Sequence, residues 1–180
     1  MDSSLAVVVI DMLNPYDHED ADVLAGNVAP VVEPISRLVR AADEAEHVEL
    51  VYVNDNYGDF AATREDLVRS ALEGEAPELI EPIVPPESAA FLQKVRHSAF
   101  YSTVLEYLLR SSGVPKVVLA GQVTEQCILY SALDAYVRHF EIRVARDAVA
   151  HIDPELGAAA LRMMERNMRV ELVDADDCLA

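Results

Sequence analysis

The chain has 180 residues, of which 52% are hydrophobic and 26% are charged, and its composition shows no low-complexity or repetitive segment. A chain of this length buries roughly 70% of the surface that its unfolded form exposes, so residues 1–180 are expected to form one domain without a stabilising disulfide or metal. The 32 acidic and 14 basic residues give a net charge of −18, which repels the phosphate backbone and disfavours nucleic acid as a partner.

The sequence gives no indication of a membrane protein. The longest apolar runs, such as LAVVVI at 5–10, are far shorter than the ~20 residues that span a bilayer, and no basic stretch precedes them as in an export signal. These features favour a cytoplasmic protein, in which the two cysteines, Cys127 and Cys178, are expected to be free thiols. Cys178 lies near the C-terminus, where chains fray, and is expected to be an ordinary thiol.

Apolar runs rich in β-branched residues alternate along the chain with apolar residues at three- and four-residue spacing. In chain order this pattern predicts a strand at 5–10, a helix at 28–46, a strand at 48–53, a helix at 63–74, a proline-rich surface loop at 76–88, a strand at 91–95, a helix at 101–110, a strand at 116–120, a helix at 125–138, a strand at 140–145, a helix at 155–168 and a strand at 169–173. The alternation predicts a three-layer, doubly wound α/β fold with a mostly parallel sheet and helices on both faces. In such folds ligands bind outside the carboxyl ends of the strands.

Polar side chains stand at three of these strand ends. Asp11 follows the first strand, where a buried carboxylate needs a partner, although it could equally cap the DMLNP loop. Lys94 lies at the end of FLQK, where a buried ammonium would need an anion and an exposed edge-strand lysine would not.

Cys127 is the third residue. Gly121 begins the turn after the strand, Thr124 is a plausible N-cap, and Cys127 then falls in the first helical turn, where free N–H groups and the helix dipole favour a thiolate. The alternative is a small apolar cysteine that packs the helix on the sheet. Together the three residues could supply a base, a cation and a nucleophile.

Four stretches carry a family resemblance: VVVIDMLNPY at 7–16, VYVNDNYGDF at 51–60, KVRHSAFYSTVLEYLL at 94–109 and VVLAGQVTEQCILYSALDAYVRHFEIRVARDAVA at 117–150. In this order, over nearly the whole chain, they resemble the isochorismatase-like cysteine hydrolases, which include nicotinamidases and N-carbamoylsarcosine amidases.

The resemblance implies a catalytic triad of Asp11, Lys94 and Cys127, in which the cysteine attacks a carbonyl, the aspartate moves protons and water hydrolyses a covalent acyl-enzyme. It also implies a cis peptide bond between Gln122 and Val123, and an oxyanion hole formed by the N–H groups of Val123 and Cys127. The implied function is cleavage of a C–N bond in a small amide or carbamoyl compound.

The resemblance also implies a substrate pocket near Tyr16, Tyr57 and Phe60, between the loops at 14–20 and 56–66. Leu13 and Pro15 replace polar residues that are common beside it in the family, which suggests a less polar rim.

Nicotinamidases of this family hold a metal through an aspartate and histidines. Here Asp55 is retained, but Tyr57 stands where a histidine would be and no two of the five histidines have ligand spacing. We therefore expect neither a metal nor another cofactor, and interpret Asp55 as a turn residue.

The sequence is also compatible with other functions. A signalling receiver or ligand-binding domain could use Asp11 without catalysis, but a receiver needs further acidic residues that the first and third strand ends do not supply. An aspartyl phosphatase would need a second carboxylate where Leu13 stands. A degenerate, non-catalytic family member is the main alternative. The resemblance further implies a homo-oligomer, a dimer or tetramer.

Overall fold

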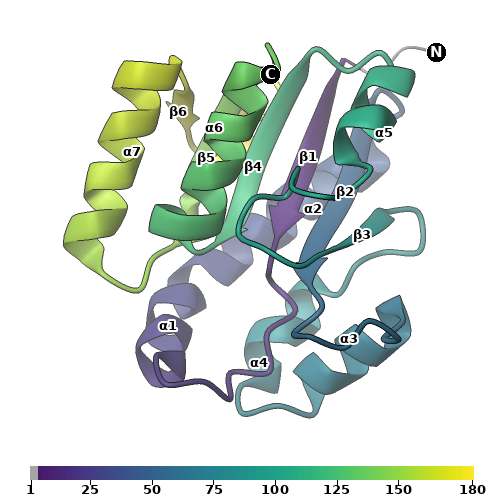
Figure 1. Ribbon diagram of the computed structural model, residues 1–180, viewed down its shortest axis with the longest axis vertical. Coiled ribbons are helices and arrows are strands. Elements are labelled where there is room, and N and C mark those ends of the chain that lie inside the picture. Colours follow the sequence, from purple (N-terminus) through teal and green to yellow (C-terminus); the bar gives the residue numbers. More distant parts are fainter. Residues whose placement is uncertain (1–3) are drawn as a thin grey trace.

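The structure is a computed structural model that describes residues 4–180 of the chain (Figure 1). Six strands, all parallel, form one sheet in the order β3-β2-β1-β4-β5-β6. The strands are β1 (Leu5–Ile10), β2 (Val48–Asp55), β3 (Ala90–Lys94), β4 (Lys116–Gln122), β5 (Glu141–Ala150) and β6 (Glu171–Val173). The order reverses between β1 and β4, and the crevice beyond their carboxyl ends is where ligands bind in folds of this kind.

Helices cover both faces of the sheet, so the predicted three-layer α/β fold is confirmed. On the face toward the viewer in Figure 1 lie α5 (Leu105–Ser111), α6 (Leu129–Val137) and α7 (Pro154–Met168). The other helices, with the short helical turns between them, are α1 (Ala21–Val28), η1 (Ala29–Val31), α2 (Val32–Glu44), α3 (Arg64–Leu72), α4 (Pro77–Ile80), η2 (Glu81–Ile83) and η4 (Ala175–Asp177). Figure 1 shows α1, α3 and α4 gathered near the carboxyl ends of the strands.

Strand β1 shows why the sheet is buried on both sides. All six of its residues are buried, and their side chains alternate between the two faces because successive residues of a strand point in opposite directions. Leu5, Val7 and Val9 join the cluster under α2, whereas the intervening residues join the cluster under α5, α6 and α7. The polar residue that follows such a strand is thereby held at the edge of the core.

The structure corrects the predicted elements in four places. Helix α1 was not predicted, and the expected helix at 28–46 is divided into the turn η1 and helix α2. The proline-rich loop at 76–88 contains α4 and η2, each with a proline in its first turn, where a missing N–H costs nothing. Helix α5 begins at Leu105 and not near residue 101.

Within residues 4–180, no helix combines the length and apolar character needed to cross a bilayer.

Candidate active site

Asp11 follows β1 directly and is buried, with 8% of its surface exposed. Its N–H donates to the carbonyl of Val53 at 3.0 Å, and its φ of 54° turns the chain away from the strand direction. Oδ1 accepts the backbone N–H of Asp55 at 2.8 Å, and Oδ2 lies 2.8 Å from Nζ of Lys94. The carboxylate therefore has the partners that a buried charge requires.

Lys94 is the last residue of β3, and only 1% of its surface is exposed. Its long side chain reaches past β2, so that Nζ lies 3.6 Å from Oδ2 of Asp55 and 3.7 Å from Sγ of Cys127, in addition to its contact with Asp11. One ammonium group thus contacts two carboxylates and the thiol.

Cys127 lies in a π-helical turn, η3 (Thr124–Ile128), between β4 and α6. Single π-helical turns of this kind are frequent at functional sites. Gly121, which was expected to begin the turn, is instead the sixth residue of β4, with a φ of 116°. A Cβ there would lie 2.2 Å from the carbonyl oxygen of Ile10, so glycine is what lets β4 pack against β1 and brings η3 close to Asp11.

The structure thus brings together the three residues that the sequence singled out at strand ends. The thiol of Cys127 is within hydrogen-bonding reach of the Asp11 carboxylate as well as of Lys94. Burial raises the pKa of Asp11, although the neighbouring ammonium opposes this. Burial disfavours the charged form of Lys94, but Asp11, Cys127 and Asp55 together outweigh it and raise the pKa of the ammonium.

The resting thiol differs from the sequence-based expectation. We expected the helix N-terminus to lower the pKa of Cys127, but burial and the adjacent Asp11 carboxylate raise that pKa, against the opposing effects of Lys94 and the backbone of Val123. The expectation that Thr124 caps the helix is also wrong. Val123 occupies the N-cap position, and the buried Oγ1 of Thr124 has no hydrogen-bond partner among the described residues.

The peptide bond between Gln122 and Val123 is cis. The Gln122 side chain is buried, and its Nε2 donates to the carbonyl of Asp11 at 2.6 Å. The carbonyl of Val123 accepts the N–H groups of Gln126 and Ile128, at 3.0 and 3.1 Å. The chain between β4 and α6 is therefore fixed around the thiol on both sides.

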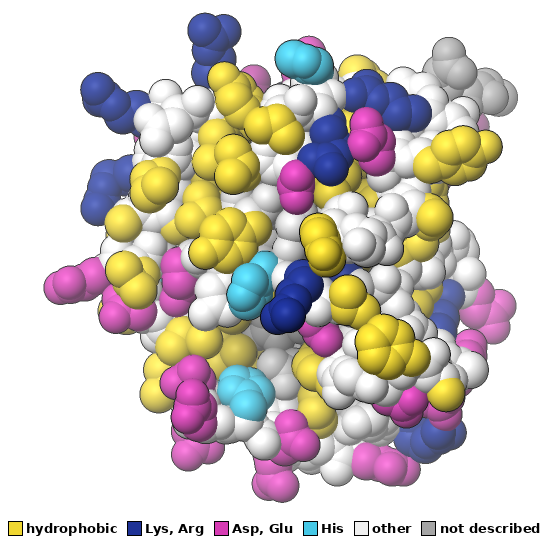
Figure 2. Space-filling view, viewed as in Figure 1, with side chains coloured by type: hydrophobic (Ala, Val, Ile, Leu, Met, Phe, Trp, Pro, Cys, Tyr) yellow, Lys and Arg dark blue, Asp and Glu magenta, His cyan; other side chains and the backbone are white. Residues whose placement is uncertain are grey.

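A cavity of about 380 Å³ opens above this cluster. Asp11, Lys94 and Cys127 line its floor, and its walls come from the loop after β1, the end of β2, the loop after β3, the turn after β4 and the loop after β5. Figure 2 shows the face of the molecule hollowed near its middle, with histidine side chains beside the hollow.

The three pocket residues expected from the sequence have different positions. Tyr57 lines the cavity, and its hydroxyl donates to the carbonyl of Leu13 at 2.9 Å. Tyr16 does not line the cavity: it is buried behind the wall, with its hydroxyl 3.5 Å from Oε1 of Gln122. Phe60 is 80% exposed and does not line this cavity.

Leu13 and Pro15, on which the expectation of a less polar rim was based, do not line the cavity. His18 and Asp20 border it on the side of the loop after β1. On the side of the loop after β3, His97 places Nδ1 3.9 Å from Sγ of Cys127 and its ring 5.4 Å from that of Tyr130. Sequence reasoning missed His97, although its position three residues after Lys94 in KVRHSAF was a usable signal.

One wall of the cavity is clamped from two sides. Ile152 lines the cavity, and Oε1 of Glu125 accepts the N–H groups of Ile152 and Asp153 at 3.0 and 2.9 Å. Nδ2 of Asn27 donates to the carbonyls of His151 and Ile152 at 2.9 and 3.3 Å. The loop after β5 is thereby tied both to η3, which carries Cys127, and to α1.

The residues near Asp55 do not fit the metal site that some relatives hold. Asp55 ends β2, and its Oδ1 accepts the backbone N–H of Tyr57 at 2.8 Å, which is the local turn contact that we expected. Its Oδ2 faces Lys94, and the hydroxyl of Tyr57 is directed to the backbone of Leu13. Over residues 4–180, no three His, Cys, Asp or Glu side chains are grouped to hold an ion.

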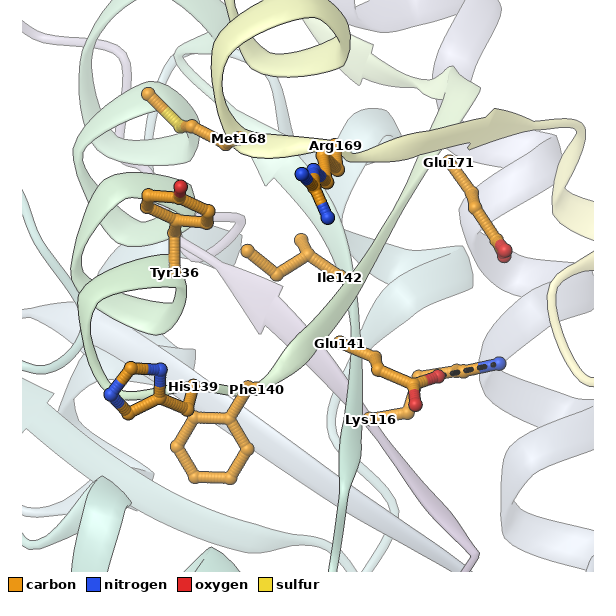
Figure 3. Close-up of a pocket in the computed structure, with 9 residues that line it drawn as sticks. All are labelled: Lys116, Tyr136, His139, Phe140, Glu141, Ile142, Met168, Arg169 and Glu171. Atoms are coloured by element: carbon orange, nitrogen blue, oxygen red, sulfur yellow. Dashed lines mark ion pairs between the residues drawn. The ribbon is translucent and has the colours of Figure 1, made fainter.

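A slightly larger cavity, of about 410 Å³, lies at the opposite end of the sheet, beside the amino ends of the strands (Figure 3). Its lining includes Lys116 and Glu141, which form an ion pair of 3.4 Å, together with Tyr136 and Arg169. It contains no thiol and no buried carboxylate, so its size alone does not make it the reactive site.

Comparisons with known proteins point to one family. A sequence model of the isochorismatase domain matches residues 5–177. A maleamate amidohydrolase of Pseudomonas putida is 30% identical over 158 residues, which are 83% of this chain and 74% of that protein. A probable inactive nicotinamidase of Arabidopsis thaliana is 30% identical over 178 residues, covering 89% of this chain and 87% of the relative. The structure of an N-carbamoylsarcosine amidase from Thermoplasma acidophilum aligns with a TM-score of 0.75 and 28% identity, over 97% of this chain and 98% of that one.

Proposed function

The chain belongs to the isochorismatase family of hydrolases, and from this membership and the cluster around Cys127 we propose that it cleaves the C–N bond of a small amide or carbamoyl compound. In this proposal Cys127 is the nucleophile and forms a covalent acyl-enzyme. Asp11 is the general base and acid, and the ammonium of Lys94 stabilises the negative charge beside it. The relatives named as amidohydrolase and amidase support the class of reaction.

The raised pKa of the thiol bears on the first step of the proposed reaction. Because burial and the Asp11 carboxylate favour the protonated thiol, we propose that the proton leaves as the sulfur attacks, with Asp11 as the base within reach. The S–H proton passes to Asp11, the sulfur bonds to the carbonyl carbon, and the carbonyl oxygen becomes an oxyanion. In the proposal this oxyanion accepts hydrogen bonds from the N–H groups of Val123 and Cys127, and donors of this sort lower a barrier by ~3 kcal/mol each.

The remaining steps return every proton. Asp11 gives its proton to the leaving nitrogen, the C–N bond breaks, and an amine or ammonia departs, leaving a thioester on Cys127. Water then attacks the thioester carbon while Asp11 accepts a proton from it. The C–S bond breaks, the sulfur recovers a proton from Asp11, and the acid is released. The net reaction is amide plus water to acid plus amine.

The observation that carries this proposal is the position of Lys94. Nζ lies 2.8 Å from Asp11 and 3.7 Å from the Cys127 sulfur, while the side chain is 99% buried. Burying an unpaired ammonium costs free energy. Lys94 therefore needs a negative charge beside it, on Asp11 or on the Cys127 sulfur. In the proposed mechanism the ammonium pairs with the Asp11 carboxylate at rest and again in the acyl-enzyme, after Asp11 has given its proton to the leaving nitrogen.

The test is release of ammonia from a panel of small amides and carbamoyl compounds by the wild-type chain and two cysteine variants. Cys127→Ser is expected to lose at least about 10³-fold in kcat/KM on any substrate found, because the alkoxide is far harder to form than the thiolate. Cys178→Ala is the matched control and should retain full activity. Full activity in Cys127→Ser would refute the proposal.

A second candidate, a family member without catalytic activity, is favoured by the relative that is named a probable inactive nicotinamidase. It predicts that no compound of the panel is hydrolysed and that small amides bind without turnover. Assembly into a dimer or tetramer stays a prediction, and sedimentation analysis would test it.

A further inference from the structure

We propose that the cavity above Cys127 selects neutral or cationic amides and rejects substrates that carry a carboxylate. This inference rests on the proposed function for the identity of the site, but it concerns the charge of the cavity and not the chemistry of the thiol. It is drawn from the charged side chains that line the cavity.

Three carboxylates line the cavity, from Asp11, Asp20 and Asp55, against a single ammonium from Lys94. That ammonium lies 2.8 Å from Asp11 and 3.6 Å from Asp55, so it is already shared between two carboxylates. The carboxylate of Asp20 makes no hydrogen bond or ion pair within residues 4–180, and its side chain is exposed at the rim. The described lining residues therefore include no further lysine and no arginine that could pair with a substrate carboxylate.

The other polar lining groups do not change this balance. His18 and His97 contribute imidazole rings, and Asn14, Gln122 and Gln126 are neutral amides. Neutral amides can hydrogen-bond an uncharged carboxamide or urea group as donor and as acceptor. The net charge of −18 adds a field of the same sign.

The contrast with the relatives makes the inference specific. Maleamate and N-carbamoylsarcosine, the compounds in their names, each carry a carboxylate next to the amide or carbamoyl group. A site for such compounds needs a cation that is not already paired with the catalytic residues. Arg96 is the nearest candidate in the sequence, since it is exposed and lies between Lys94 and His97, but it is not a lining residue of the cavity.

The experiment compares two alkylating reagents of nearly the same size, neutral iodoacetamide and anionic iodoacetate, on Cys127 of the folded chain at pH 9. In both reactions the thiolate displaces iodide, so the fraction of thiolate cancels from the ratio of the two rates. The same ratio in the urea-unfolded chain is the reference. We expect folding to favour the neutral reagent by at least about tenfold, and added salt to reduce the preference.

Three variants assign the effect. Asp20→Asn should recover several-fold of the iodoacetate rate, whereas Asp17→Asn, which removes an exposed carboxylate from the same loop outside the cavity lining, should change nothing. Arg96→Gln should also leave the ratio unchanged. An equal ratio in folded and unfolded chains, or a preference for iodoacetate that Arg96→Gln abolishes, would overturn the inference. A failure of the proposed hydrolysis would leave this ratio intact, so the two ideas can fail separately.

Discussion

The two cysteines are both buried, but only one of them borders a cavity and faces a carboxylate and an ammonium. Cys127 and Cys178 are both buried, and burial raises the pKa of both thiols, to about 12 for Cys178. Cys178 is packed in the core under α2, and its backbone carbonyl accepts a hydrogen bond from Arg143 at 2.8 Å. Cys127 instead borders a cavity and faces Asp11 and Lys94. A buried thiol becomes a plausible nucleophile through a base within reach and space for a substrate, not through a lowered resting pKa.

The largest effect expected from this comparison follows removal of the base. Asp11→Asn should lower the hydrolysis rate by about 10²- to 10⁴-fold, because general acid–base catalysis is lost. The same change should lower the pKa of the Cys127 thiol. Burial and the Asp11 carboxylate both raise that pKa, and the substitution removes the contribution of the carboxylate. Alkylation of Cys127 at pH 8 should therefore accelerate while hydrolysis slows.

The matched control lies beside the other cysteine. Asp147 also raises the pKa of its neighbouring thiol, Cys178, so Asp147→Asn repeats the change in charge without touching the cavity. It should leave hydrolysis unchanged. If hydrolysis and alkylation of Cys127 both slowed in Asp11→Asn, Asp11 would act by favouring the resting thiolate. It would then not be the base that removes the thiol proton during attack.

The next effect concerns stability. Lys94→Ala should reduce the free energy of unfolding by about 3–5 kcal/mol, because it leaves the buried Asp11 carboxylate without its cation. Arg143→Ala, beside Cys178, should cost only about 1–2 kcal/mol, since its ion pair with Glu171 is exposed on the carboxylate side. Urea unfolding followed by circular dichroism measures both.

The pH dependence of the Lys94→Ala deficit has a definite sign. Burial raises the folded-state pKa of Asp11, and Lys94 opposes that rise, so the variant should have a still higher pKa at this carboxyl. A group with a raised folded-state pKa favours folding below its unfolded pKa and loses that contribution as the pH rises through the folded value. The deficit should therefore be smaller near pH 4 than at pH 8, and a deficit independent of pH would contradict this account.

The smallest effect expected is a difference in reactivity between the two thiols. At pH 8, iodoacetamide should modify Cys127, which is 7% exposed at the cavity, at least about tenfold faster than the fully buried Cys178. The difference should vanish in concentrated urea. Peptide mass spectrometry gives both rates in one sample, and equal rates in the folded chain would mean that the cavity does not admit reagents to the sulfur.

The sequence was sufficient for the layers of the fold because the strands are continuous apolar runs. It was insufficient for α1, whose segment ADVLAGNV contains Gly26 and Asn27 and lacks a strong helical pattern. That helix forms because Leu24 and Val28 pack into the core, and Asn27 reaches the loop after β5. Such tertiary contacts leave no trace in local periodicity.

The candidate site was predictable where residues follow strands. The parallel sheet carries Asp11 and Lys94 to one edge, so their convergence needed only the strand ends and the topology. The rim was not predictable, because Tyr16, Phe60 and His97 lie in loops. In a loop, moving a turn by one residue along the sequence changes whether a side chain is buried, exposed or directed into the cavity. The direction of the Cys127 pKa shift was missed because it depends on burial, which the N-terminal helix argument ignored.

The clamp on Ile152 has a consequence for how binding energy is distributed. With its backbone N–H and carbonyl already held by Glu125 and Asn27, this apolar wall loses little conformational entropy when a ligand arrives. More of the contact energy of a bound amide can then appear as affinity. A preformed wall also adapts poorly to larger ligands, so the cavity is expected to discriminate by shape as well as by charge.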